Sequence, residues 1–169
     1  MPECADAFAA ACNTIPNGSL LQAGAIVASA LGVIFLILSN RKVACKKAIV
    51  DFINHAQTDG DMIEARMKFI ALKEAGRLEQ FASKDRMASN EANTIRFILN
   101  MYEIAAIGIA AKAFDEQIYR DWCRTTLVKD WMATKHFVAQ YQREHNPKIY
   151  IGFEAMAKKW ANEDERRHV

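Results

Sequence analysis

The sequence predicts an all-α protein in which one N-terminal transmembrane helix continues into a cytoplasmic bundle of about four to five helices. Three observations predict this class: a charge-free apolar run over residues 20–38, helical spacing of apolar residues through most of the remaining chain, and no alternating strand pattern. The overall composition hides this division, since 51% hydrophobic and 25% charged residues with a mean hydropathy of −0.10 are typical of a soluble domain. The 169 residues therefore hold a membrane segment and one ordered domain.

The apolar run reads LLQAGAIVASALGVIFLIL, which is 19 residues without a charge. At ~1.5 Å of rise per residue, a helix of this length reaches ~28 Å, close to the ~30 Å hydrocarbon thickness of a bilayer. A cleaved signal peptide would begin with basic residues, but the segment before the run contains Glu3 and Asp6 and neither Lys nor Arg. The run is therefore predicted to be a transmembrane helix.

The charges that flank the run predict its orientation. Four basic residues follow it closely: Arg41, Lys42, Lys46 and Lys47. Because basic residues near the ends of a span stay on the cytoplasmic side, we expect a single-pass inner-membrane protein with residues 1–19 outside, 20–38 in the membrane and 41–169 in the cytoplasm. The cytoplasmic part has all 22 basic and 18 of the 20 acidic residues, a net charge of +4, and its basic cluster suits anionic membrane lipids.

Two features of the N-terminal part concern a possible disulfide and the association of two membrane helices. Cys4 and Cys12 would lie ~12 Å apart if the segment between them were helical, too far for a disulfide, so a bridge would require a bend. Within the predicted span, Gly24, Ala28 and Gly32 recur every four residues, a spacing that lets two helices approach closely. This spacing suggests a homo-oligomer formed through the membrane helix, although it is also common by chance in alanine-rich spans.

The first two predicted helices are separated by Thr58-Asp59-Gly60. The membrane helix is expected to continue to this turn, since apolar residues keep helical spacing there, and Ser19 could cap its beginning. Asp61 followed by Glu64 predicts a capping box that opens a second helix through Phe81. The apolar side of that helix is predicted to contain Ile63, Met67, Ile70, Leu78 and Phe81.

Three more helices are predicted after the polar segment 83–89. The third covers about 90–111, and the fourth covers 116 to about 144 with Asp115 as its cap. A bend at Thr125-Thr126 is expected in the fourth, because Trp122 and Trp131 would otherwise face opposite sides of one straight helix. The last helix is expected to begin at Pro147. Its inward residues are predicted to be Ile151, Met156 and Trp160.

The most informative polar pattern is Arg96, Asn100 and Glu103, which share one face of the otherwise apolar third helix. Polar groups in such a helix are costly unless they are bonded, so the simplest interpretation is a buried network that fixes helix register. Its partner from another helix would be Tyr119, Arg120 or Arg124. Two alternatives remain open at this point: a recognition groove for a partner or small ligand, and a catalytic role for Glu103.

The chain contains no motif for metal binding, phosphate binding or nucleophilic catalysis, so no catalytic residue, metal site or cofactor is predicted. The four histidines are scattered without metal-ligand spacing, the glycines form no phosphate-binding loop, and neither Cys45 nor Cys123 has a histidine one helical turn away. Basic and aromatic residues interleave around Trp122, but neighbouring acidic residues dilute the positive charge. Nucleic acid is therefore not an expected partner.

Several segments carry a family resemblance: TIRFILNMYEIAAIGI, FDEQIYRDW and NPKIYIGFEAMAKKW. Over roughly 41–162 the chain resembles an uncharacterised helical family of bacterial and phage proteins, the domain-of-unknown-function family numbered forty-seven sixty. The resemblance implies a single N-terminal span before a helical domain and brings no known activity. Members of that family have a basic pair and a glycine before the Phe-Asp-Glu stretch, where this chain has Ala110-Ala111-Lys112. This departure argues against a left-handed glycine cap at that helix end.

These observations favour a membrane-anchored helical module that binds another protein in a structural or regulatory role. The alternative is a ligand-sensing or enzymatic helical domain that uses the face of Arg96, Asn100 and Glu103, with a link to phage defence or prophage maintenance. The partner and the biological process are not encoded in any motif of the sequence.

Overall fold

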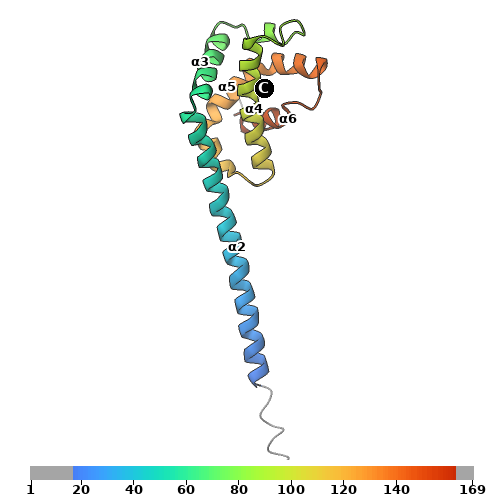
Figure 1. The fold of residues 1–169 in the computed structure, drawn as a ribbon. Helices are drawn as coiled ribbons and strands as arrows, with labels where there is room; N and C mark the ends of the chain where they lie inside the picture. The colour runs from blue at the N-terminus through green and yellow to red at the C-terminus, as the bar shows by residue number, and fades with distance from the viewer. Residues whose placement is uncertain (1–16, 163–169) are drawn as a thin grey trace, which may run out of the picture. The chain divides into compact units, whose positions relative to one another are not determined.

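The computed structural model describes residues 17–162, and this part of the chain is entirely helical, without a strand. The predicted all-α class is therefore confirmed. Five α-helices and one 3-10 turn follow in order (Figure 1): α2 Asn17–Thr58, α3 Gly60–Glu74, η1 Glu79–Phe81, α4 Asn90–Ala110, α5 Glu116–Glu144 and α6 Ile151–Trp160. The chain divides into two units at Val43 and Ala44, and helix α2 crosses this boundary. Cys4 and Cys12 lie outside the described residues.

In the first unit, the described residues belong to the apolar part of α2. Its large apolar side chains are exposed, for example Phe35 at 71% and Ile26 at 63%. Within the described residues, α2 is the one helix that is long and apolar enough to cross a membrane. The helix begins at Asn17, earlier than expected, so Ser19 lies inside it and is not its N-cap.

The second unit begins with the last turns of α2, which belong to its core. Ile49 is fully buried, and Phe52 lies against two aromatic rings, with centroid distances of 5.3 Å to Phe114 and 6.2 Å to Tyr119. The α2 helix ends at Thr58, as the Thr58-Asp59-Gly60 turn predicted. These turns of α2 thus form one wall of the helical domain.

Helix α3 differs from its prediction in both its cap and its buried face. The N-cap is Asp59, whose carboxylate accepts the N–H of Met62, so Asp61 is only a first-turn residue. Met62 and Phe69 are buried, whereas the predicted inward residues are exposed: Ile63, Met67 and Ile70. The prediction was wrong because the inner face also carries Arg66 and Lys73, and these cations made it read as the solvent side.

Leu78 and Phe81 are buried as predicted, but outside the helix. Helix α3 ends in a Schellman turn at Gly76, whose φ of 63° is the left-handed conformation that glycine adopts readily. Leu78 is the N-cap of η1 and Phe81 is its last residue, so both side chains reach the core from the short segment between α3 and α4.

Helix α4 begins at its predicted position, with Ser89 as N-cap, and ends in a second Schellman turn. The N–H of Ala113 donates to the Gly108 carbonyl at 2.8 Å, and that of Lys112 to the Ile109 carbonyl at 3.0 Å. Lys112 has a φ of 57°, so the left-handed cap is present although the residue is not glycine. A left-handed cap therefore forms at this helix end without the glycine.

Helix α5 has its predicted bounds, and Asp115 caps it by accepting the N–H of Ile118. The helix is continuous through Thr125-Thr126. The two tryptophans do not require a bend, because Trp131 is buried and Trp122 is 42% exposed.

The last helix does not begin at Pro147. Residues 147–150 form a turn, and α6 starts at Ile151 after Tyr150, which is left-handed with a φ of 60°. Ile151 is 52% exposed, contrary to prediction, while Met156 and Trp160 are buried as expected. Proline suits the first turn of a helix because it has no N–H that would need a partner there. This turn, however, does not continue into helical hydrogen bonds, so the helix does not start at the proline.

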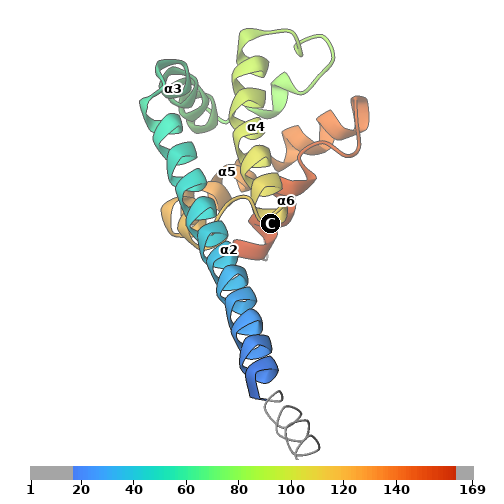
Figure 2. The same cartoon turned by 60° about the horizontal axis from the view of Figure 1, so that its bottom comes forward.

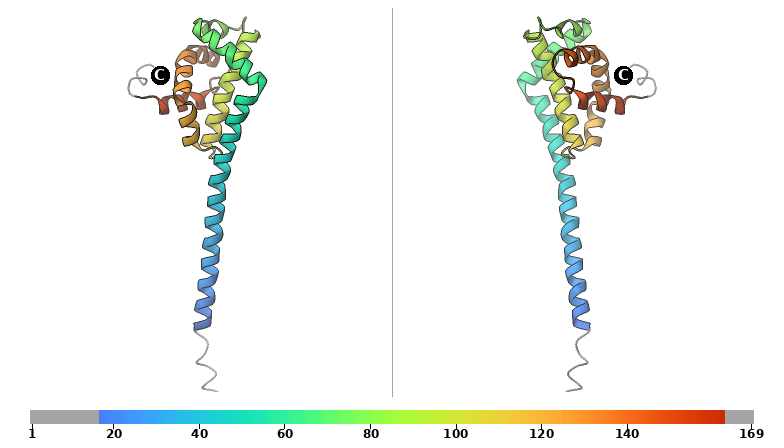
Figure 3. Two further views of the ribbon diagram at one scale, coloured as in Figure 1. Left: turned by 90° about the vertical axis from the view of Figure 1, so that its left-hand side faces the viewer. Right: turned by 90° about the vertical axis from the view of Figure 1, so that its right-hand side faces the viewer.

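Helix α4 is central in the second unit. It packs against α3 and α6, and α5 packs against α6 and η1. Figure 2 shows α6 beside α4 and α5, and both views in Figure 3 show α4 between α5 and the last turns of α2. The core between these helices is rich in aromatic residues, and Phe153 of α6 stacks on Tyr102 of α4 at 4.7 Å between centroids.

Candidate functional site

The predicted polar stripe on α4 does not form one network. The Arg96 guanidinium donates to the side chain of Asn93 and to the Tyr141 hydroxyl at 3.4 Å, and it lies over the Tyr141 ring. Asn100 is exposed. Glu103 faces α6, so the three residues share a helix face but have separate surroundings.

Glu103 instead caps α6 from a neighbouring helix. Its carboxylate oxygens accept the N–H of Gly152 at 3.1 Å and of Phe153 at 2.7 Å. These are first-turn donors that lack a partner within the helix, and α6 has no capping side chain of its own. A Cβ at position 152 would lie 3.1 Å from Glu103 Oε1, so glycine there permits the close approach.

Two of the three predicted partners of the stripe, Tyr119 and Arg124, also lie against α6, whereas Arg120 is exposed. The Arg124 Nε donates to the Trp160 carbonyl at the last turn of α6, at 2.8 Å. Tyr119 is buried, with its ring 6.0 Å from that of Trp160. Glu116 accepts the indole N–H of Trp160 and pairs with Lys159. A carboxylate at the N-terminus of α6 and a guanidinium at its C-terminus both complement the helix dipole.

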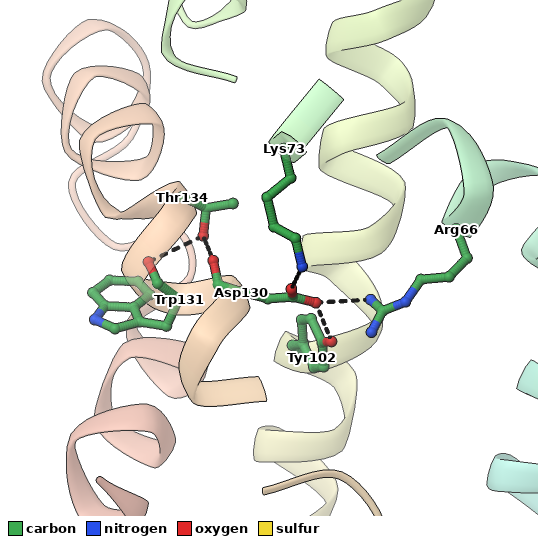
Figure 4. A network of polar contacts seen from close by, with 6 residues as sticks. All are labelled: Arg66, Lys73, Tyr102, Asp130, Trp131 and Thr134. Carbon is green, nitrogen blue, oxygen red and sulfur yellow. Dashed lines mark hydrogen bonds and ion pairs between the residues drawn. The ribbon is translucent and has the colours of Figure 1, made fainter. Parts of the chain in front are cut away.

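The most buried charged group is Asp130 of α5, which the sequence analysis did not single out (Figure 4). Its side chain is fully buried and bound by three groups from other helices. Arg66 Nη1 lies 2.9 Å from Oδ2, Lys73 Nζ lies 2.7 Å from Oδ1, and the Tyr102 hydroxyl donates to Oδ2 at 2.7 Å. The backbone carbonyl of Asp130 accepts from Thr134. Asp130 therefore links α5 to both α3 and α4.

This Asp130 cluster, defined as Arg66, Lys73, Tyr102 and Asp130, holds two cations and one anion. Among the described residues, neither cation is paired with a second carboxylate. Burial raises the pKa of Tyr102 far above its ordinary value, and the Asp130 charge raises it further, so Tyr102 remains a neutral donor. Both cations also lie over the Phe69 ring, near 6 Å from its centroid. The cluster therefore carries a net charge of +1.

A weak sequence signal for Asp130 existed. Buried residues of α5 recur at Tyr119, Cys123, Leu127, Trp131 and Thr134, and position 130 lies on the same side of the helix. On α3, positions 62, 66, 69 and 73 likewise form one stripe. A carboxylate on one inner face and two cations on another would have predicted the cluster, but only if the inner face of α3 had been known.

The cluster borders a pocket of about 280 Å³ that is contained in the second unit. Arg66 and Tyr102 contribute to both. The other side chains around it come from α2, α3, α4 and α5, and they are mostly apolar or aromatic: Phe52, Ala56, Gln57, Met62, Ile98, Met101, Tyr119, Trp122, Cys123 and Thr126. The pocket therefore has apolar walls and one cation.

Comparison with known proteins identifies a family. A family model described as a domain of unknown function, DUF4760, matches residues 19–160. The chain belongs to the DUF4760 family. The resemblance predicted from residues 41–162 is thereby confirmed, and the match extends further towards the N-terminus, over the apolar part of α2. No curated protein and no solved structure matches the chain.

The DUF4760 region includes both α6 caps, the Asp130 cluster and the pocket. Within this pocket, burial raises the pKa of the Cys123 thiol to about 12, so it stays protonated at neutral pH and is a poor nucleophile. Among the described residues, no group of His, Cys, Asp and Glu is arranged to hold a metal ion. The pocket can bind by apolar contact and by the Arg66 charge.

The remaining predicted residues of this DUF4760 chain lie on α2. The basic residues are all exposed: Arg41, Lys42, Lys46 and Lys47. Gly24, Ala28 and Gly32 are exposed as well, and a Cβ at either glycine would meet nothing within 4 Å. These surfaces are accessible, and whether lipids or a second copy cover them stays a prediction.

Proposed function

We propose that the protein is a single-pass inner-membrane protein whose cytoplasmic helical domain is a non-enzymatic interaction or regulatory module. The observation that carries this proposal is the exposed apolar surface of α2. From Gly24 to Leu38 every side chain is exposed and none is charged. Exposure of so much apolar surface to water would be unfavourable, whereas a bilayer would cover it.

The proposed orientation rests on the charges around the apolar part of α2. The exposed basic cluster Arg41, Lys42, Lys46 and Lys47 follows it, and no basic residue precedes it. This asymmetry supports an outside N-terminus. The same side chains would contact anionic lipid head groups at about 1 kcal/mol per residue.

A topology experiment tests the orientation. We expect alkaline phosphatase fused before residue 17 by way of an exported leader to remain active, and green fluorescent protein fused after residue 169 to fluoresce. A matched variant moves the charges: Arg41, Lys42, Lys46 and Lys47 become Gln, and four lysines are inserted before residue 17. Its topology should invert in part. A chain that fractionates as soluble protein would overturn the anchor.

The proposal of a protein partner is supported by the outer face of α3. Ile63, Met67 and Ile70 are exposed there at 44%, 68% and 37%, spaced i, i+4 and i+7. A stripe of large apolar side chains that includes a flexible methionine suits contact with another protein. A photo-crosslinking residue at position 67 should then give a defined adduct in cells, while one at exposed Arg120 should not. Equal labelling at both positions would contradict this assignment.

Self-association through the span is a separate part of the proposal. The small residues Gly24, Ala28 and Gly32 would allow close helix contact. Cysteine substitution at each position of 24–32 should give disulfide-linked dimers with a helical period that peaks at these three. Gly24→Ile together with Gly32→Ile should abolish the pattern. A flat profile would leave the protein monomeric in the membrane.

A further inference from the structure

The pocket beside the Asp130 cluster plays no part in the function proposed above. Its walls are built from α2, α3, α4 and α5, and all its residues follow Ala44, so it belongs to the helical domain alone. Binding in this pocket would therefore be independent of membrane anchoring.

The net positive charge of the Asp130 cluster indicates that a ligand beside it would be negatively charged. Among the described residues, Asp130 is the single carboxylate that pairs with both Arg66 and Lys73, so the cluster keeps one positive charge in excess. Lys73 does not line the pocket, but Arg66 does, and 32% of its side chain is exposed. Its ion pair with Asp130 is made through Nη1. Because a guanidinium has five donors in a planar fork, it can bind an incoming carboxylate while it holds Asp130.

The side chains that line the pocket indicate the chemistry and size of the remainder of the ligand. Phe52, Ile98, Met101 and Trp122 offer apolar and aromatic surface, and none of the described residues that line the pocket is anionic. Cys123 is protonated because burial raises the pKa of its thiol, and Tyr102 is a neutral hydroxyl. A volume of about 280 Å³ is at the lower limit of the ~300–1,000 Å³ of small-molecule pockets, which favours a compact ligand.

We propose that this pocket binds a compact monocarboxylic acid with an apolar body the size of one ring, and that the carboxylate pairs with Arg66. Inorganic phosphate does not fit this description, because its hydrated oxygens would face apolar walls. A long fatty acid would leave much of its chain outside this volume. Benzoate has the proposed size and charge, and benzamide is its neutral counterpart of the same shape.

The test uses the full chain in nanodiscs with ¹³C-labelled methionine methyl groups. Met62 and Met101 line the pocket, whereas Met67 lies on the exposed outer face of α3 and serves as an internal control. We expect benzoate to shift the signals of Met62 and Met101 saturably in the millimolar range and to leave that of Met67 unchanged. Benzamide should bind at least about tenfold more weakly, since it lacks the charge.

Two variants separate the role of Arg66 from general effects of charge. Arg66→Met leaves Lys73 to neutralise Asp130, so the cluster becomes neutral and the preference for benzoate over benzamide should disappear. Lys68→Met removes a cation two residues from Arg66 that pairs with exposed Glu64, and the preference should persist.

Three results would overturn the inference: no saturable shift at Met62 and Met101, equal binding of benzoate and benzamide, or an unchanged preference in Arg66→Met. If the last variant loses its helical circular dichroism signal, the comparison of the two ligands on the natural chain decides the matter. A soluble, unanchored protein that still prefers benzoate would refute the membrane proposal and support the pocket.

Discussion

Asp130 and Glu103 are both carboxylates that join helices, but they do so in different surroundings. Asp130 is fully buried and pairs with two cationic side chains from α3, and it accepts a hydrogen bond from a hydroxyl of α4. Glu103 is half-buried and accepts two backbone N–H groups of α6, while Arg124 binds the other end of that helix. The first site has full charges as partners, and the second has the partial charges of helix ends. We therefore expect loss of the Asp130 interactions to lower the free energy of unfolding more than loss of the Glu103 interactions.

The largest effect is expected for Asp130→Asn. The substitution keeps the shape but leaves Arg66 and Lys73 without an anion, and an unpaired buried charge costs about 3–5 kcal/mol. Arg66 and Lys73 are about one third and one quarter exposed, which favours the lower end of this range. Chemical unfolding of the detergent-solubilised chain, followed by circular dichroism, measures the change. Exposed Asp121→Asn is the matched control and should change stability by less than about 0.5 kcal/mol.

A combined variant sharpens this first prediction. Replacement of all three charges, as in Arg66→Met, Lys73→Met and Asp130→Leu together, removes the unpaired cations as well. Such a triple substitution is expected to be far less destabilising than Asp130→Asn alone, because apolar groups of similar volume replace the ion pairs. If the triple variant were the less stable of the two, the Asp130 cluster would contribute more than charge neutralisation.

Glu103→Gln should have an intermediate effect. The amide can accept only one of the two N–H groups well and lacks the charge that complements the N-terminus of α6, so we expect a loss of about 2 kcal/mol. The loss should be local. Hydrogen exchange should accelerate at Gly152 and Phe153 and remain slow in α4 and α5. Uniform acceleration across the domain would show that α6 is not a separate cooperative unit.

Arg124→Met should be milder, at about 1 kcal/mol, because the methionine retains the apolar stem while the bond to the Trp160 carbonyl is lost. The same unfolding experiment measures it. Exposed Arg120→Met provides the control on the same helix. An effect of Arg124→Met equal to that of Asp130→Asn would refute the distinction between the two sites.

The smallest effect concerns pH. The pKa of Glu116 is lowered from its ordinary 4.5 by hydrogen bonds from Lys159 and Trp160. A lowered carboxyl pKa adds stability above 4.5 that is lost as the pH falls through the folded-state value. Glu116→Gln should thus be less stable than the natural chain at neutral pH, and the difference should vanish in acid. A difference that persists unchanged at low pH would mean that charge plays no part.

Sequence patterns located the helices better than their faces. Helix α5 was predicted at its observed bounds because Asp115 is a strong cap and an Asn-Pro pair follows. The inner face of α3 was missed because charged residues normally indicate solvent, and only the distant Asp130 reverses that meaning for Arg66 and Lys73. Glu103 was identified as a residue in need of a partner, but backbone donors of a helix end have no signature in side-chain sequence.

The two capped ends of α6 also determine when this helix can fold during synthesis. At ten residues, α6 is shorter than an isolated helix needs to be stable in water. Its N-terminal cap lies about fifty residues earlier in the chain and its C-terminal cap about thirty-six. A ribosome releases α6 after α4 and α5, so the surface on which α6 packs can form before it. A chain that terminates before Tyr150 would leave the Glu103 carboxylate and the Tyr102 ring uncovered, which is the kind of surface that quality-control proteases recognise.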